Sequence, residues 1–168
     1  RHNGLTQLER LLEEHHTTHH RVIIVTESIF SMDGDQADLQ KLTELKRKYD
    51  NVLLYVDEAH AFGVRGRQGL GCAEEFHCIH DMDFLVGTFG KAAASVGAYI
   101  VCKKVIREYL VNRMRTLIFT TGLPPVNIAW TLFIVRRLAD MQERRKHLAH
   151  ISRTLREALQ VRGYTCPS

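Results

Sequence analysis

The stretch NVLLYVDEAH, residues 51–60, joins a run of apolar side chains to an abruptly polar end. An unbroken apolar run of this length is typical of a strand in a parallel sheet that is covered on both faces. The polar residues follow where that strand would end. The stretch therefore predicts a buried strand that brings Asp57 and His60 to one edge of a sheet.

Similar patterns recur on both sides of this stretch. Further strands are expected at residues 21–28, 83–91 and 97–104, of which the first should also be buried on both faces. Helical spacing of apolar residues appears at 5–14, 33–50, 103–116 and 126–161, the last with a bend partway. Strands that alternate with helices predict an α/β fold with a mostly parallel sheet and flanking helices.

The composition excludes several classes of protein. The 168 residues are enough for one sizeable domain, and 45% hydrophobic with 25% charged residues is typical of a globular protein. The net charge of +4 suits an anionic small ligand, but the cations are scattered, so we expect no nucleic-acid partner. Without a membrane span, a signal peptide or a paired cysteine framework, we expect a cytoplasmic protein.

The predicted strand ends carry the residues suited to chemistry. In open α/β sheets, ligands bind outside the carboxyl ends of the strands. Three strands end in such residues, which we expect to form one site: Glu27 with Ser31, Asp57 with His60, and Thr88 with Lys91.

Lys91 stands alone among small residues in GTFGKAAASVGAY, residues 87–99. A lysine amine can act as a nucleophile by forming a Schiff base with a substrate carbonyl or with pyridoxal 5′-phosphate (PLP). PLP also needs an acid beside its pyridine nitrogen, for which Asp57 is the candidate. His60 could reach the phenolic oxygen or stack on the ring, and Thr88 could bind the phosphate.

Each of these residues alone also has a structural interpretation. Asp57 could cap a turn, His60 could be a satisfied polar residue, and Lys91 could be a solvated loop lysine. Their occurrence together on successive strand ends favours a cofactor site.

Four ordered motifs carry a family resemblance. VTESIFSMDGD (25–35), LLYVDEAHAFGVRGRQGLG (53–71), GTFGKAAASVGAYIV (87–101) and RTLIFTTGLPP (115–125) resemble the α-oxoamine synthases over essentially the whole chain. These are fold-type-I PLP enzymes that condense an amino acid with an acyl-CoA and release carbon dioxide. The motifs are most similar to the branch in biotin synthesis, which joins alanine to a pimeloyl thioester. The alternatives within the family are the glycine-using C-acetyltransferases and the serine palmitoyltransferases.

The resemblance implies a role for each site residue. Lys91 would bind PLP and later move the substrate α-proton. Asp57 would pair with the pyridine nitrogen, and Thr88 would bind the phosphate. His60 would form a hydrogen bond to the phenolic oxygen, and Ser31 would lie nearby.

The resemblance also implies a homodimer. Thr120 and Thr121 fall where a second subunit reaches the cofactor phosphate, so the active site would be shared, and Glu27 would lie near it. Residues 1–125 would belong to the PLP-binding large domain. Residues 126–168 would form the long helix and the start of a smaller C-terminal domain.

The sequence departs from the family pattern at several points. Ala94 stands where the family usually has glycine, and Gly122 where alanine is commoner. The upstream ring-stacking histidine and the downstream arginine that holds the substrate carboxylate have no counterpart here. Since the chain also begins without Met, we expect it to be truncated at both ends and unable to complete catalysis by itself.

Other interpretations rest on shorter motifs. YVDEAH (55–60) also matches the box of DEAH ATPases, but the P-loop that should accompany it is missing from this sequence. A non-catalytic partner subunit is a further alternative, although such subunits typically lose the lysine. HHTTHH (15–20) is expected to be a solvated loop, and the spacing in CAEEFHCIH (72–80) is too irregular for zinc. We therefore expect no metal site and buried or half-buried cysteines.

Overall fold

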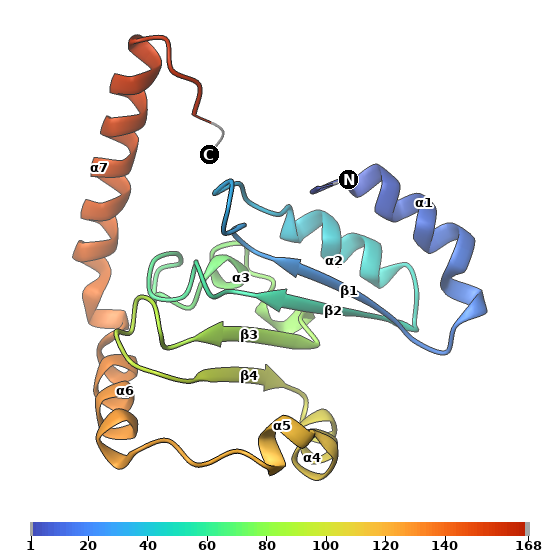
Figure 1. Cartoon of the computed structure of the whole chain (residues 1–168). Coiled ribbons are helices and arrows are strands. Elements are labelled where there is room, and N and C mark those ends of the chain that lie inside the picture. The colour runs from blue at the N-terminus through green and yellow to red at the C-terminus, as the bar shows by residue number, and fades with distance from the viewer. Residues whose placement is uncertain (1, 167–168) are drawn as a thin grey trace.

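The computed structural model describes residues 2–166, which form a four-stranded sheet in the order β1-β2-β3-β4 (Figure 1). The strands are β1 (Val22–Glu27), β2 (Val52–Asp57), β3 (Phe84–Thr88) and β4 (Ala98–Cys102). The first three are parallel, and β4 runs antiparallel to β3. This arrangement confirms the predicted mostly parallel sheet.

Helices connect and follow the strands. They are α1 (Leu5–His15), α2 (Leu39–Arg47), α3 (Cys72–Glu75), α4 (Lys104–Arg113), α5 (Arg115–Ile118), α6 (Pro125–Arg137) and α7 (Gln142–Val161). Short 3₁₀ turns occupy His16–Thr18, Ile79–Asp81 and Ala139–Met141. The last of these turns interrupts the long C-terminal helical pattern, as expected from the sequence.

Helix α2 begins later than its sequence pattern suggests. The side chain of Asp38 accepts a hydrogen bond of 2.9 Å from the backbone N–H of Lys41 and so caps the first turn. Residues ahead of this cap form a turn closed by a bridge between Ile29 and Gln36. The cap therefore separates the turn after β1 from the helix.

The main core lies between the sheet and helices α1 and α2. Leu54 and Val56 of β2 are fully buried there, together with Leu12 of α1 and Leu39 of α2. These side chains alternate with half-buried ones along β2, so its inward face supplies the core.

The expectation that the first strand is buried on both faces is wrong. Strand β1 is an edge strand, and Ile23 and Val25 are 51% and 68% exposed, whereas Ile24 is buried. A continuous apolar run cannot distinguish an edge strand from a central one, because both faces are apolar in either case.

The C-terminal helices leave the sheet. Figure 1 shows α7 projecting away from the strands, and Arg145 is the buried residue of this helix. Its Nη1 donates to the Leu138 carbonyl at 2.6 Å, and its Nη2 donates to the Arg67 carbonyl. Arg145 thus ties α7 to the loop that follows β2. No helix within residues 2–166 has the length and apolar character needed to cross a membrane.

Candidate active site

The carboxyl ends of β1, β2 and β3 lie side by side at one edge of the sheet. Glu27 pairs with Asp57, and Asp57 pairs with Val86, two residues before Thr88. The parallel register therefore brings together the three strand ends that the sequence singled out.

Lys91 and His60 are in direct contact. Lys91 Nζ lies 2.6 Å from His60 Nε2, although the residues come from loops after different strands. When the imidazole is neutral with its proton on Nδ1, the ammonium donates to Nε2. The two side chains also line an open cleft of about 440 Å³, with Ala59, Phe62, Val64 and Ala92. The cleft thus presents an amine and an imidazole to one ligand.

Asp57 uses one carboxylate oxygen to hold its turn. Its Oδ1 accepts a 2.8 Å hydrogen bond from the Ala59 N–H, while Oδ2 has no hydrogen-bond partner among residues 2–166. The pKa of Tyr55 on the same strand is raised, mainly by burial and to a smaller extent by the negative charge of Asp57. The turn-capping interpretation of Asp57 is therefore correct for one oxygen, and the other oxygen is available to a ligand.

Thr88 closes the loop that carries Lys91. Its hydroxyl donates to the Gly97 carbonyl and accepts from the Gly90 N–H, both at 3.1 Å. The Phe89 N–H also donates to the Gly97 carbonyl at 2.9 Å. In this structure the threonine hydroxyl fixes the loop between β3 and β4.

The backbone conformation of Ala94 accounts for the glycine usual in the family. Ala94 has φ +48°, in the left-handed region that favours glycine, and its N–H donates to the Lys91 carbonyl at 3.0 Å. Its methyl group is exposed, so the departure from the family pattern affects the backbone conformation rather than the packing. A Cβ added at Gly122 would have no heavy atom within 4 Å, so an alanine would fit there equally well.

Of the predicted site residues, only His60 and Lys91 line the cleft; Asp57 and Thr88 do not line it, and neither do those that follow. The Ser31 N–H donates to Glu27 Oε2 at 3.2 Å, so these two residues stabilise the turn after β1. Thr120 and Thr121 are exposed between α5 and α6. Their predicted role depends on a second subunit and remains a prediction.

Glu58 was missed by the reasoning from sequence. Its carboxylate is fully buried, and it accepts hydrogen bonds from Ser28 Oγ at 2.6 Å, the Cys72 N–H at 3.0 Å and the Ala73 N–H at 2.7 Å. Burial raises the pKa of Glu58, while these hydrogen bonds oppose the shift. The sequence feature that could have pointed to this buried carboxylate is the glycine-rich loop that follows it. Gly71 of this loop packs directly against the carboxylate, since a Cβ at this position would lie 2.5 Å from Glu58 Oε2.

An aromatic cluster packs beside the loop that carries Lys91. Tyr99 packs against Phe62 and Phe89, with ring centroids 5.2 and 5.3 Å apart. Burial raises the pKa of Tyr99. Tyr99 pairs with Gly87 across β3 and β4, and a Cβ on Gly87 would overlap the tyrosine oxygen. Gly87 therefore makes room for the Tyr99 ring.

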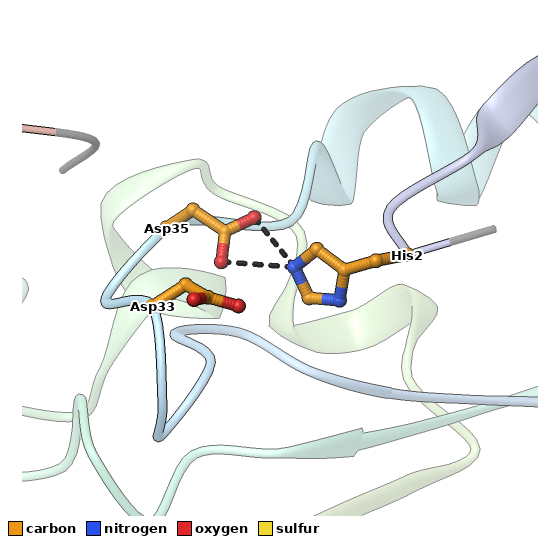
Figure 2. A group of neighbouring side chains, drawn as sticks. All are labelled: His2, Asp33 and Asp35. Carbon is orange, nitrogen blue, oxygen red and sulfur yellow. Dashed lines mark hydrogen bonds and ion pairs between the residues drawn. The ribbon is translucent and has the colours of Figure 1, made fainter.

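A separate group at the N-terminal side contains His2, Asp33 and Asp35 (Figure 2). His2 Nε2 lies 3.0 and 2.9 Å from the two oxygens of Asp35, and Asn3 Nδ2 donates to the same carboxylate at 3.2 Å. The hydrogen bond of His2 lowers the pKa of Asp35. The group could hold a cation only if His2 gave up this hydrogen bond, so we interpret it as an anchor between the N-terminal segment and the turn after β1.

The other motifs have structural roles. His16 Nδ1 is 2.9 Å from the Leu12 carbonyl at the end of α1, and none of the histidines of residues 15–20 joins a metal-type group within residues 2–166. Cys72 and Cys78 are buried, as expected. Burial raises the pKa of their thiols to about 12 and about 11, respectively.

Curated relatives match nearly the whole chain. A relative from Glaesserella parasuis is 60% identical over 97% of this chain and 43% of its own length, and it is provisionally named 8-amino-7-oxononanoate synthase. A protein from Haemophilus ducreyi carries that name without qualification and is 54% identical over 96% of this chain. This chain spans 43% of the length of each of the two relatives.

Solved structures share the fold. A serine palmitoyltransferase from Sphingomonas wittichii superposes with a TM-score of 0.91 and 33% identity, covering 99% of this chain and 41% of that one. The serine palmitoyltransferase from S. paucimobilis with bound PLP and myriocin gives a TM-score of 0.90 and 29% identity, covering 99% and 42%. These matches confirm the predicted fold-type-I architecture.

The family model described as aminotransferase class I and II matches residues 1–168. Together with the named relatives, this match confirms the resemblance on which the sequence prediction rested. The chain belongs to the aminotransferase class I and II family, within which it is similar to the α-oxoamine synthases.

Proposed function

We propose that this chain is the PLP-binding portion of an 8-amino-7-oxononanoate synthase, which condenses L-alanine with a pimeloyl thioester in biotin synthesis. The two curated relatives that carry this name are 60% and 54% identical over nearly the whole chain. The contact of 2.6 Å between Lys91 Nζ and His60 Nε2 is the observation that carries the proposal, because it places a nucleophilic amine in a cleft at the strand ends.

The residues present fit PLP. Asp57 Oδ2 has no hydrogen-bond partner within residues 2–166 and would accept a hydrogen bond from a protonated pyridine nitrogen. Lys91 would hold the aldehyde carbon, and His60 would contact the phenolic oxygen with Ser31 nearby. The Thr88 hydroxyl would donate its proton to the phosphate in place of the Gly97 carbonyl, while it still accepts from the Gly90 N–H. When bound, PLP acts as an electron sink for the electrons released at the substrate α-carbon.

The chain's own residues would then divide the work. Lys91 would remove and return the proton at the substrate α-carbon through Nζ, and the neighbouring imidazole of His60 would fix the position of that amine. Asp57, held by the Ala59 N–H, would keep the proton on the pyridine nitrogen. The bond from the Gly90 N–H to the Thr88 hydroxyl and the bond from the Phe89 N–H to the Gly97 carbonyl would hold the lysine loop in register.

We further infer a homodimer whose second subunit reaches the phosphate through Thr120 and Thr121. The segment beside them exposes large apolar side chains, among them Phe119 at 78% and Val126 at 72%, as a surface covered in an assembly would. Residues 1–125 would lie in the large domain, and residues 126–168 would lead into the small one.

The partners would be an amino acid and an acyl-CoA, with no role for nucleic acid or membrane, since the cations are scattered along the chain. The four free cysteines fit the reducing conditions of the cytoplasm, where we place the protein.

The test compares substrates on the complete gene product. Release of the CoA thiol is measured with L-alanine plus pimeloyl-CoA, glycine plus acetyl-CoA, and L-serine plus palmitoyl-CoA, each in the presence of PLP. The first pair should give the highest kcat/KM. A higher value with either other pair would move the protein to another branch of the family, and no release with any pair would refute the proposed function.

A further inference from the structure

Glu58 joins three segments that come from different parts of the chain. Its Oε2 accepts from Ser28 Oγ at the end of β1 and from the Cys72 N–H, while Oε1 accepts from the Ala73 N–H. The carboxylate is fully buried. Because a buried charge is costly unless several hydrogen bonds compensate it, this residue is built into the fold rather than left over at a strand end.

The backbone of Glu58 holds the turn that follows β2. Its N–H donates to the Val86 carbonyl on β3 at 2.7 Å, and its carbonyl accepts from the Ala61 N–H at 2.9 Å and the Phe62 N–H at 2.7 Å. Asp57 and His60 lie within or directly beside this turn. The side chain and the backbone of Glu58 therefore fix both residues from two directions.

We propose that Glu58 is a positioning residue of the cofactor site: its buried carboxylate anchors the turn that sets Asp57 Oδ2 and His60 Nε2 relative to Lys91. The proposal rests on the proposed function in one respect: the groups that Glu58 positions are the ones that would bind PLP. Displacement of the turn would misplace the acceptor for the pyridine nitrogen and separate His60 from Lys91, although Glu58 itself touches neither cofactor nor substrate.

Glutamine cannot replace this carboxylate. All three protein groups around it can donate, and two of them are backbone N–H groups. In one orientation the N–H₂ of the glutamine amide would face the Cys72 N–H, and in the other orientation it would face the Ala73 N–H. One buried donor would then lose its acceptor, which costs about 1–3 kcal/mol in folded proteins. We expect the turn to move in order to relieve this conflict.

Glu74 provides a matched control. It accepts from the Gln68 N–H at 2.8 and 3.1 Å and from the Leu70 N–H at 3.0 Å in the glycine-rich loop, and within residues 2–166 it makes no hydrogen bond to the turn at residues 58–62. Glu74→Gln therefore disturbs the loop by the same chemistry without acting on Asp57 or His60.

The experiment compares Glu58→Gln and Glu74→Gln with the wild type in the complete gene product. Two quantities are measured: the NMR chemical shifts of the His60 ring in the PLP-free protein, and the Kd for PLP from its visible absorption. Glu58→Gln should move the His60 ring signals, because the ring leaves Lys91, and should weaken PLP binding roughly tenfold, as expected for the loss of about one hydrogen bond. Glu74→Gln should change neither.

Two results would overturn the proposal. One is a Glu58→Gln protein with a lower Tm but unchanged His60 ring signals and PLP affinity, which would leave Glu58 a purely structural role. The other is equal changes in the two variants, which would assign the effect to the loop. If the wild type bound no PLP, the proposed function would fail, and the chemical shifts of the His60 ring would still decide the role of Glu58.

A second variant covers the case in which Glu58→Gln does not fold. Ser28→Ala removes one donor and leaves the carboxylate with its two backbone partners. It should move the His60 ring signals in the same direction as Glu58→Gln does, by a smaller amount. Unchanged ring signals in a folded Ser28→Ala protein would contradict the anchoring role.

Discussion

Replacing Gly87 by alanine should displace Tyr99 and destabilise the sheet edge that carries Lys91. An alanine Cβ would overlap Tyr99 Oη and would lie 2.5 Å from Cζ and 2.7 Å from Cε1, well inside ordinary contact distance. Gly87 does not adopt a positive φ, so the substitution adds no backbone strain. The cost therefore comes from moving the tyrosine ring.

The magnitude follows from what Tyr99 would lose. The ring would give up its contacts with Phe62 and Phe89, and each aromatic pair contributes about 0.5–1.5 kcal/mol. Overpacking adds about 1–3 kcal/mol, and the lower entropy of the unfolded alanine chain offsets about 0.4–1 kcal/mol. We expect Gly87→Ala to lower the free energy of unfolding by about 2–4 kcal/mol.

Urea unfolding of the complete gene product, followed by circular dichroism, measures this change. Gly122→Ala is the matched control, because no heavy atom lies within 4 Å of its added Cβ, and it should change the stability by no more than about 0.5 kcal/mol. Equal stability of the two variants would refute the explanation that Gly87 makes room for Tyr99.

Three further predictions concern a backbone conformation, two thiols and an ion pair. Ala94→Gly should be neutral or stabilise by up to about 1 kcal/mol in thermal unfolding, whereas Ala94→Val should destabilise, because φ is +48°; the reverse order would contradict left-handed strain. In the native protein, the buried Cys72 and Cys78 should react with a thiol reagent only after the half-exposed Cys102 and Cys166, because burial raises the pKa of the Cys72 thiol to about 12 and that of the Cys78 thiol to about 11. Mass mapping that finds Cys72 or Cys78 labelled first would contradict this prediction. Arg65 holds the pKa of Glu75 below 4.5, so this pair stabilises the fold above pH 4.5 and loses its effect as pH falls through the folded-state pKa. The difference in Tm between wild type and Glu75→Gln should therefore vanish in acid, and a difference independent of pH would exclude the ion pair as its cause.

The fold was largely predictable because its strands are short apolar runs with polar ends. The mostly parallel sheet and the convergence of Glu27, Asp57 and Thr88 follow from that pattern and from the geometry of α/β sheets. Burial was harder to predict. Ile23 and Val25 are as apolar as the core, but the edge position of β1 leaves them exposed.

The internal contacts of the site were not predictable, because they join residues distant in sequence. The Ser28–Glu58 hydrogen bond spans 30 positions, and the contact of Lys91 with His60 spans 31. Glu58 follows Asp57 directly, so the sequence pattern does not distinguish a ligand-facing carboxylate from a buried anchor. That distinction depends on donors from Ser28, which follows β1, and from α3, which only the folded chain brings together.

The covalent position of PLP on the complete gene product tests the central claim most directly. The protein is incubated with PLP, reduced with borohydride and digested, and the modified lysine is identified by mass spectrometry. The contact of Lys91 with His60 in the cleft predicts the label on Lys91, with none at the exposed Lys104 and none at all in Lys91→Ala. A label at another lysine of this chain, or unchanged labelling of Lys91→Ala, would contradict the account.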